Sequence, residues 1–149
     1  MQPMEQAVIN TGRPVNMMSF ENAIRTVVED KFFDFSGRAS RSEYWWMQLG
    51  LIGLQIGMVI VFTIMGLILG EAGALLGMGL MVLLSLALFL PLLGVTVRRL
   101  HDGGRSGWWF LLALIPFVNF IGAWVILVFL IMDGQPGDNQ YGPVPTNTR

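Results

Sequence analysis

One short stretch holds most of the side chains in this sequence that could do chemistry. It reads RRLHDGGRSGWW, residues 98–109, and contains three arginines, the only histidine, an aspartate and a pair of tryptophans. A histidine beside a carboxylate suggests general acid–base catalysis, and a glycine-rich segment with a cation suggests phosphate binding. Which of these chemistries is built depends on the elements that flank the stretch.

The local pattern fits neither chemistry. His101 and Asp102 are adjacent, and on a helix adjacent side chains point about 100° apart, so adjacency alone does not form a His–Asp relay. Ser106 and the other candidate nucleophiles do not lie in a G-x-S-x-G turn, and residues 103–107 lack the lysine of a P-loop. We therefore expect no enzyme activity and no catalytic residue.

The amino-acid composition further narrows the class of protein to which this chain can belong. With no cysteine and one histidine, the sequence excludes disulfides, thiolate metal sites and multi-histidine metal sites, and we expect no cofactor. A formal net charge of −1 gives no basic field for nucleic acid. Only 13% of residues are charged, against about 25% in soluble domains, and the mean hydropathy is +0.61. Such a chain is typical of a membrane protein.

Three long stretches carry no charge: residues 44–70, 72–97 and 106–132. A helix crosses a hydrocarbon layer about 30 Å thick with roughly 20 residues, and none of these stretches has the polar stripe of a soluble helix. The sequence predicts an all-α membrane protein with three transmembrane helices, at about 44–67, 75–97 and 108–131.

The flanking segments are predicted from composition and capping patterns. Residues 1–18 lack periodicity and are expected to be disordered, and Ser19 can cap a short amphipathic helix at about 19–33. Turn-forming residues after position 133 lead into a tail, 137–149, that is expected to be extended. Residues 19–136 then form a single membrane domain.

The start of the first long helix carries a capping box. Ser40 and Glu43 have the required spacing, so each side chain is expected to bind the backbone amide of the other. Further along this helix, Gly53 and Gly57 form a G-x-x-x-G pair, a pattern that permits close helix packing.

Several residues inside the apolar stretches are polar or disrupt helices. Gln48 and Gln55 share a helix face, and their amides are expected to point at protein rather than lipid. Pro91 is expected to kink the second helix. Pro116 and Asn119 interrupt the third, which leaves a re-entrant hairpin open as the alternative to three full crossings.

The placement of lysine and arginine predicts the orientation in the membrane. With the N-terminus inside, eight of the nine basic residues lie on the cytoplasmic side, whereas the reverse orientation puts eight outside. Basic residues favour the cytoplasmic side, so we expect a multi-pass protein with a cytoplasmic N-terminus. The side of the C-terminus stays open, since it depends on whether the third helix crosses fully.

A structural role explains the residue types of the stretch 98–109 better than a catalytic role does. Arg98 and Arg99 are expected to end the second helix, where cations favour the helix dipole and meet anionic phospholipid headgroups. Asp102 is expected to pair with an arginine of residues 38–41 or with one nearby. His101 is expected to be a structural hydrogen-bond donor rather than a pH sensor. The hypothesis is a charged clasp at the cytoplasmic interface, formed by Arg38, Arg41, Glu43, Arg99, His101, Asp102 and Arg105.

Three blocks carry a family resemblance. They are FDFSGRASRSEYWW at 33–46, RRLHDGGRSGWWFLLALIPFVNFIG at 98–122 and GQPGDNQYGP at 134–143. In this order they resemble the bacterial inner-membrane family called domain of unknown function 805, which includes YhaH-like proteins. The resemblance implies an integral protein of the bacterial inner membrane, and it implies no agreed reaction, ligand or catalytic residue.

Two functions remain open. The first is a non-enzymatic interaction or structural module in the bilayer, which binds itself or another membrane protein. The second is a subunit of an oligomeric transport or lipid-handling system, in which Gln48, Gln55 and Asn119 line a polar route near the break at Pro116.

Overall fold

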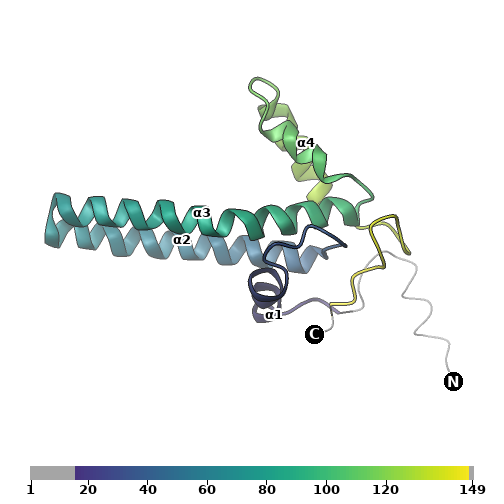
Figure 1. Ribbon diagram of the computed structural model, residues 1–149, viewed down its shortest axis with the longest axis horizontal. Coiled ribbons are helices and arrows are strands. Elements are labelled where there is room, and N and C mark those ends of the chain that lie inside the picture. Colours follow the sequence, from purple (N-terminus) through teal and green to yellow (C-terminus); the bar gives the residue numbers. More distant parts are fainter. Residues whose placement is uncertain (1–15, 148–149) are drawn as a thin grey trace.

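The computed structural model describes residues 16–147, and this part of the chain is helical, without a named β-strand. Its longest feature is an arm of two antiparallel helices, and the other elements gather at one end of that arm (Figure 1). The elements in chain order are α1 (Phe20–Arg25), a π-helical turn (Thr26–Asp30), α2 (Arg41–Leu69), α3 (Glu71–Asp102), a 3₁₀ helix (Gly107–Ala113) and α4 (Asn119–Ile131).

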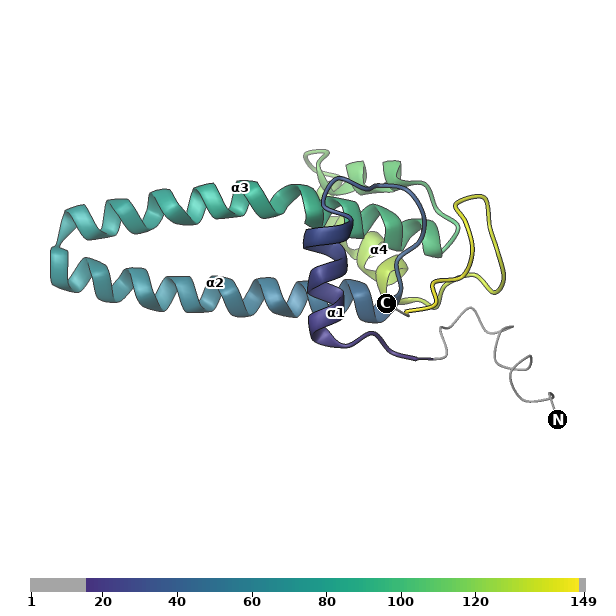
Figure 2. The ribbon, with the colours of Figure 1, turned by 60° about the horizontal axis from the view of Figure 1, so that its bottom comes forward.

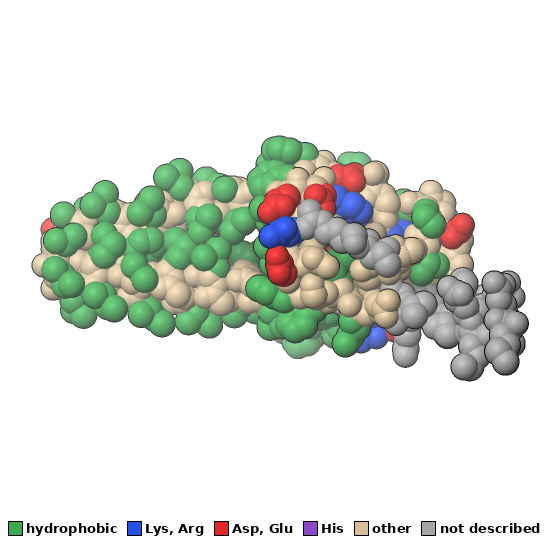
Figure 3. Space-filling model, turned by 90° about the horizontal axis from the view of Figure 1, so that it is seen from below, with side chains coloured by type: hydrophobic (Ala, Val, Ile, Leu, Met, Phe, Trp, Pro, Cys, Tyr) green, Lys and Arg blue, Asp and Glu red, His purple; other side chains and the backbone are tan. Residues whose placement is uncertain are grey.

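The arm consists of α2 and α3, and both helices are long and apolar enough to cross a membrane. The 29 residues of α2 span about 43 Å, more than the hydrocarbon layer requires. On the face shown in Figure 3, hydrophobic side chains cover the arm, and most charged side chains gather at the end where α1 lies. Lipid is therefore the solvent that fits the surface of the arm.

The two long helices extend beyond their predicted limits. The predicted helices 44–67 and 75–97 left residues 68–74 for a turn, but the turn is a single residue, Gly70, whose φ of +66° reverses the chain without the penalty a side chain would add. At its other end α3 continues to Asp102, so the expected loop over 98–107 begins five residues later. The helix also runs through Pro91 without interruption.

Glycines on α3 set the close approach of the two helices. A Cβ atom on Gly77 would lie 2.6 Å from Cβ of Phe62, and one on Gly73 would lie 2.5 Å from the carbonyl oxygen of Met65. By contrast, Gly53 and Gly57 have no atom within 4 Å of an added Cβ. The predicted G-x-x-x-G pair on α2 therefore takes no part in the packing of the arm.

The amphipathic helix lies crosswise over α2 (Figure 2) and is shorter than predicted. Ser19 caps it, with Oγ accepting from the amide of Asn22 at 3.2 Å, but the α-helix changes to a π-helical turn at Thr26 and ends at Asp30. This helix, α1, contacts α2 at Gly50, where an added Cβ would lie 2.9 Å from Cδ1 of Ile24.

The prediction of one helix over 108–131 is wrong. The chain forms the 3₁₀ helix, turns through Phe117, which has a φ of 67°, and returns as α4. The 3₁₀ helix and α4 pack closely together. At Gly122 of α4, an added Cβ would lie only 2.5 Å from the carbonyl oxygen of Leu112. Pro116 lies in this turn, where its missing amide and its restriction of the preceding residue oppose a continuous helix.

Both termini of the described chain pack on the charged end of the arm. Residues 1–15, most of the segment expected to be disordered, lie outside the described residues, and Met18 donates its amide to Oγ of Ser42 at 3.0 Å. The tail, which we expected to be extended, turns back between Asn139 and Gly142, whose backbones pair. Residues 148–149 are also outside the described part.

The packing predicts that Gly77→Ala destabilises the arm. The new methyl group would overlap Phe62, and overpacking of this kind costs about 1–3 kcal/mol. The measurement is thermal unfolding of the purified protein in mild detergent. Gly79→Ala is the matched control, because an added Cβ there meets no atom within 4 Å and alanine favours a helix. Equal melting temperatures for the two variants would contradict this account of the packing.

Candidate functional site

The carboxylate of Asp102, at the end of α3, is the centre of a buried charge cluster. Arg38 approaches its Oδ1 with Nε at 2.9 Å and Nη2 at 2.8 Å, and both side chains are almost fully buried. The same guanidinium donates to the carbonyl oxygens of Gln135 at 2.8 Å and Gly137 at 2.7 Å. Arg38 thus joins the segment before α2 to the end of α3 and to the tail.

A second buried arginine, Arg99, shares this carboxylate. Its Nη1 donates to Oδ2 of Asp102, its Nε donates to the carbonyl oxygen of Leu130 at 3.1 Å, and its Nη2 donates to the carbonyl oxygen of Met132. These bonds attach the end of α4 to α3. The backbone of Gly134 lies so close that an added Cβ would be 2.2 Å from Oδ2 of Asp102.

A separate buried ion pair joins α2 to α3. Arg98 Nη1 donates to Oε1 of Glu43 at 2.6 Å, and both side chains are buried. The capping box forms only in half: Oγ of Ser40 accepts from the Glu43 amide at 3.1 Å, while the Glu43 carboxylate binds Arg98 instead of the Ser40 amide. Leaving a buried guanidinium without a counter-charge costs more free energy than leaving the amide at a helix start without a capping side chain.

The expectation that Arg98 and Arg99 meet lipid headgroups is wrong, because both side chains are buried in the protein. Their relative exposures are 0% and 1%, so their charges are compensated inside the protein. The backbone supports this position as well, because the amide of Ala39 donates to the carbonyl oxygen of Arg98 at 3.0 Å.

The remaining clasp residues lie around the edge of the cluster. Nδ1 of His101 is 3.1 Å from the carbonyl oxygen of Gly37, to which it donates, and the imidazole stacks on Tyr141 at 3.8 Å between ring centroids. Arg105 lies 3.8 Å above the ring of Phe129 and does not contact Asp102.

Arg41, one of the arginines considered as a partner of Asp102, pairs with Asp133 instead. Its Nη1 lies 2.7 Å from Oδ1 of Asp133, and the two side chains are 48% and 38% exposed. Of the seven clasp residues, the structure brings three, Arg38, Arg99 and Asp102, into one hydrogen-bonded unit.

Sequence reasoning missed the contribution of the tail and the partner of Glu43. Asn139 Nδ2 donates to the carbonyl oxygen of His101 at 2.9 Å, and Tyr141 supplies the stacked ring. The available signal was the block GQPGDNQYGP, which combines small turn-forming residues with a side-chain amide, Asn139, and an aromatic ring, Tyr141.

The turn that leads into Arg38 is fixed by a charged hydrogen bond. Asp34 Oδ1 accepts from Oγ of Ser36 at 2.5 Å and from the Ser36 amide at 2.9 Å. These bonds stabilise the carboxylate, so the pKa of Asp34 lies below its usual value, chiefly because of the Ser36 hydroxyl.

The polar residues expected to line a route are not brought together. Gln48 donates to the Tyr44 hydroxyl at 2.9 Å, Gln55 is exposed further along α2, and Asn119 is exposed at the start of α4. Within residues 16–147 no three histidine, aspartate or glutamate side chains are grouped so that they could hold a metal ion.

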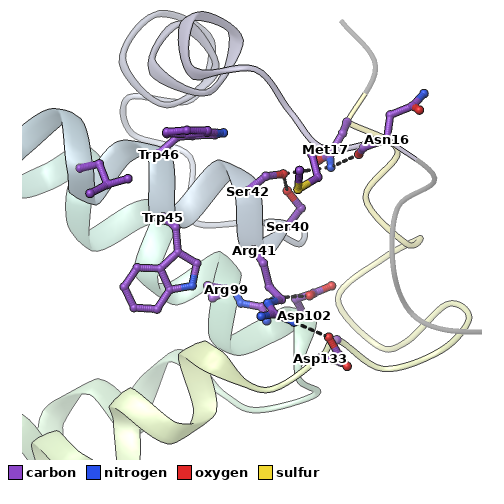
Figure 4. Close-up of a pocket in the computed structure, with 13 residues that line it drawn as sticks. Asn16, Met17, Ser40, Arg41, Ser42, Trp45, Trp46, Arg99, Asp102 and Asp133 are labelled. Carbon is purple, nitrogen blue, oxygen red and sulfur yellow. Dashed lines mark hydrogen bonds and ion pairs between the residues drawn. The ribbon is translucent and has the colours of Figure 1, made fainter.

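A pocket of about 470 Å³ lies beside the cluster, at the N-terminal end of α2 (Figure 4). Arg41, Arg99, Asp102 and Asp133 all contribute to its lining. Trp45, which is half-buried, belongs to the apolar part of the wall. This pocket thus has a charged part and an apolar part.

We expect Asp102→Asn to destabilise the protein by about 3–5 kcal/mol, because two buried arginines lose their shared counter-charge. Asp133→Asn is the matched control. It removes a partly exposed pair and should cost no more than about 1 kcal/mol. Unfolding of each variant in mild detergent measures the difference, and equal losses would show that the buried carboxylate has no special role.

Comparisons with known proteins agree with the resemblance in the three blocks. The chain is 46% identical to the inner membrane protein YhaI of Escherichia coli (strain K12), over 76% of this chain and 87% of that protein. It is 39% identical to the inner membrane protein YhaH of the same strain, over 76% of this chain and 88% of that protein. No solved structure matches the chain. Residues 32–143 match the model of the family described as protein of unknown function (DUF805), and the chain belongs to that family.

Proposed function

We propose that this protein is a non-enzymatic module of the bacterial inner membrane, in which the α2–α3 arm spans the bilayer and the charged end binds another membrane protein or a second copy. The observation that supports this proposal most is the cluster around Asp102. It connects residues 38, 99, 130 and 135 through buried hydrogen bonds at one end of an apolar arm. The buried cluster fixes the segments that form the surface of this end, and a rigid polar surface on a membrane anchor suits binding.

The bonding of the cluster also supports a non-enzymatic role. Both oxygens of Asp102 accept from arginines, so this carboxylate is occupied as a structural acceptor. The ring of His101 is stacked on Tyr141 and held through Nδ1. A catalytic acid or base needs access to a substrate, and the bonding of these two groups favours positioning over reaction.

We propose that the charged end faces the cytoplasm. The lysine and arginine residues of the described chain all lie at one end of the arm, within residues 25–41 and 98–105, and Glu71 is the charge at the opposite tip. Arg38 donates to the carbonyl oxygen of Gly137. This contact favours a cytoplasmic tail, with residues 107–131 entering and leaving the membrane on the same side.

Cysteine labelling tests this orientation without background, because the natural sequence contains no cysteine. We expect Glu71→Cys to react with a membrane-impermeant maleimide in intact cells. We expect Asp138→Cys, on the exposed part of the tail, to react only after the inner membrane is opened. Labelling of position 138 from outside would contradict the proposed topology.

Site-specific photo-crosslinking in native membranes tests the interaction role. A crosslinker at Asp138, on the charged end, should give adducts of defined size, and the same group at Leu83, an exposed residue of α3, should give lipid adducts. Introducing Asp102→Asn should abolish the defined adducts, since the surface depends on the cluster. Adducts that are absent, or unchanged by this substitution, would overturn the interaction role.

A second function is favoured by one observation. The pocket at the start of α2 combines cations and hydroxyl groups with indole rings, a chemistry that suits an amphiphile and favours lipid handling as the alternative.

A further inference from the structure

We propose that this pocket binds one phospholipid whose headgroup carries both a phosphate and a primary ammonium group. The phosphate lies at Arg41 and Ser42, the ammonium group lies at Asp133, and an acyl chain follows Trp45 and Leu49. The proposal rests on the proposed function in one respect, namely that the start of α2 lies at the membrane interface.

The spacing of residues on α2 produces a surface for an amphiphile. Arg41, Trp45 and Leu49 recur every four residues, so they share one face of the helix, and the rise from first to last is about 12 Å. The charged residue stands at the end of the helix and the apolar residues follow toward the membrane. A headgroup and the first part of an acyl chain have the same order of polarity.

The polar end of the pocket offers donors of two kinds. Arg41 is half exposed, and a guanidinium binds phosphate oxygens through charge-assisted hydrogen bonds. The hydroxyl groups of Ser40 and Ser42 also line the pocket and hydrogen-bond to each other at 3.1 Å, which leaves one of the two O–H groups as a donor for a ligand. Figure 4 shows Arg41 between these serines and Asp133.

The apolar wall is accessible from the membrane side. Trp45 and Trp46 are both half-buried, and Leu49 is 54% exposed. Indole rings favour the depth of the headgroups in a bilayer, where they contact both the polar and the apolar parts of a lipid. The pocket volume of about 470 Å³ lies within the usual range for small-molecule sites, and the rest of the chain would extend along Leu49 into the bilayer.

The charges of the side chains that line the pocket favour a headgroup with both a phosphate and an ammonium group over a purely anionic headgroup. Two arginines and two aspartates line the pocket, and of these Arg99 and Asp102 are buried and bonded to each other, with Asp102 also bonded to Arg38 behind the pocket wall. Arg41 and Asp133 remain at the accessible end, 2.7 Å apart. A purely anionic headgroup would place its phosphate beside the Asp133 carboxylate, which is unfavourable, whereas a phosphate and an ammonium group complement both side chains.

The test is native mass spectrometry of the full-length protein in mild detergent with an equimolar mixture of phosphatidylethanolamine, phosphatidylcholine and phosphatidylglycerol. We expect phosphatidylethanolamine to be retained at least about fivefold over the other two, since it alone combines a phosphate with an N–H donor for Asp133. Equal retention of all three lipids, or preferential retention of phosphatidylglycerol, would overturn the proposal.

Variants assign the preference to the pocket. Arg41→Gln should lower retention of phosphatidylethanolamine about fivefold, and Asp133→Asn should remove its advantage over phosphatidylcholine. Arg25→Gln is the matched control, because Arg25 is also exposed and paired with an acidic residue, Glu21 at 3.0 Å, but lies outside the pocket. If Arg41→Gln and Arg25→Gln retain the lipid equally, the site is not at Arg41.

Two measurements keep the test decisive. Melting temperatures in detergent report whether each variant is folded, and Leu49→Gln supplies an independent loss of the apolar wall if Arg41→Gln does not fold. Lipid retention in detergent does not depend on orientation in the cell. An unexpected labelling pattern at positions 71 and 138 would therefore overturn the topology alone, and unselective retention would overturn the lipid site alone.

Discussion

A single buried carboxylate organises the charged end of this protein. Asp102 accepts from Arg38 with one oxygen and from Arg99 with the other, and the two guanidinium groups then donate to carbonyl oxygens at residues 130, 132, 135 and 137. Those carbonyl oxygens belong to the end of α4 and to the tail. The positions of the segment before α2, the end of α4 and the tail therefore depend on charges that would be costly to bury without partners.

The cluster also explains why the long helices exceed the charge-free stretches. In α3 the last turn, residues 98–102, is charged, and in isolation it would be a poor candidate for burial. Because Arg98 pairs with Glu43, and Arg99 with Asp102, the turn stays helical and buried between α2 and the tail. The charge-free stretches mark the apolar part of each long helix, and the helices continue beyond it where paired charges permit.

Packing by small residues complements the charge cluster. Gly77 and Gly73 bring α2 and α3 together toward the tip of the arm, and Gly134 lets the tail approach the Asp102 carboxylate. At both places the absent side chain leaves room for an atom of another segment. The tip and the charged end are thus fixed by different forces, van der Waals packing in one case and buried hydrogen bonds in the other.

The sequence by itself determined the membrane class, the helical arm and the residues that carry charge near its end, because each depends on local hydropathy, capping or composition. Ser40 as a helix cap and Gly70 within the turn are of this kind. Only the tertiary structure decided that residues 107–131 form a hairpin, that Asp102 binds Arg38 and Arg99 while Arg41 binds Asp133, and that the tail covers the cluster. Several arginines and acids could pair with one another, and the pairs that form are separated by 3 to 92 residues along the chain. Apart from local pairs such as Arg99–Asp102, the pairing therefore follows from which backbone segments meet in space, and no local pattern encodes that.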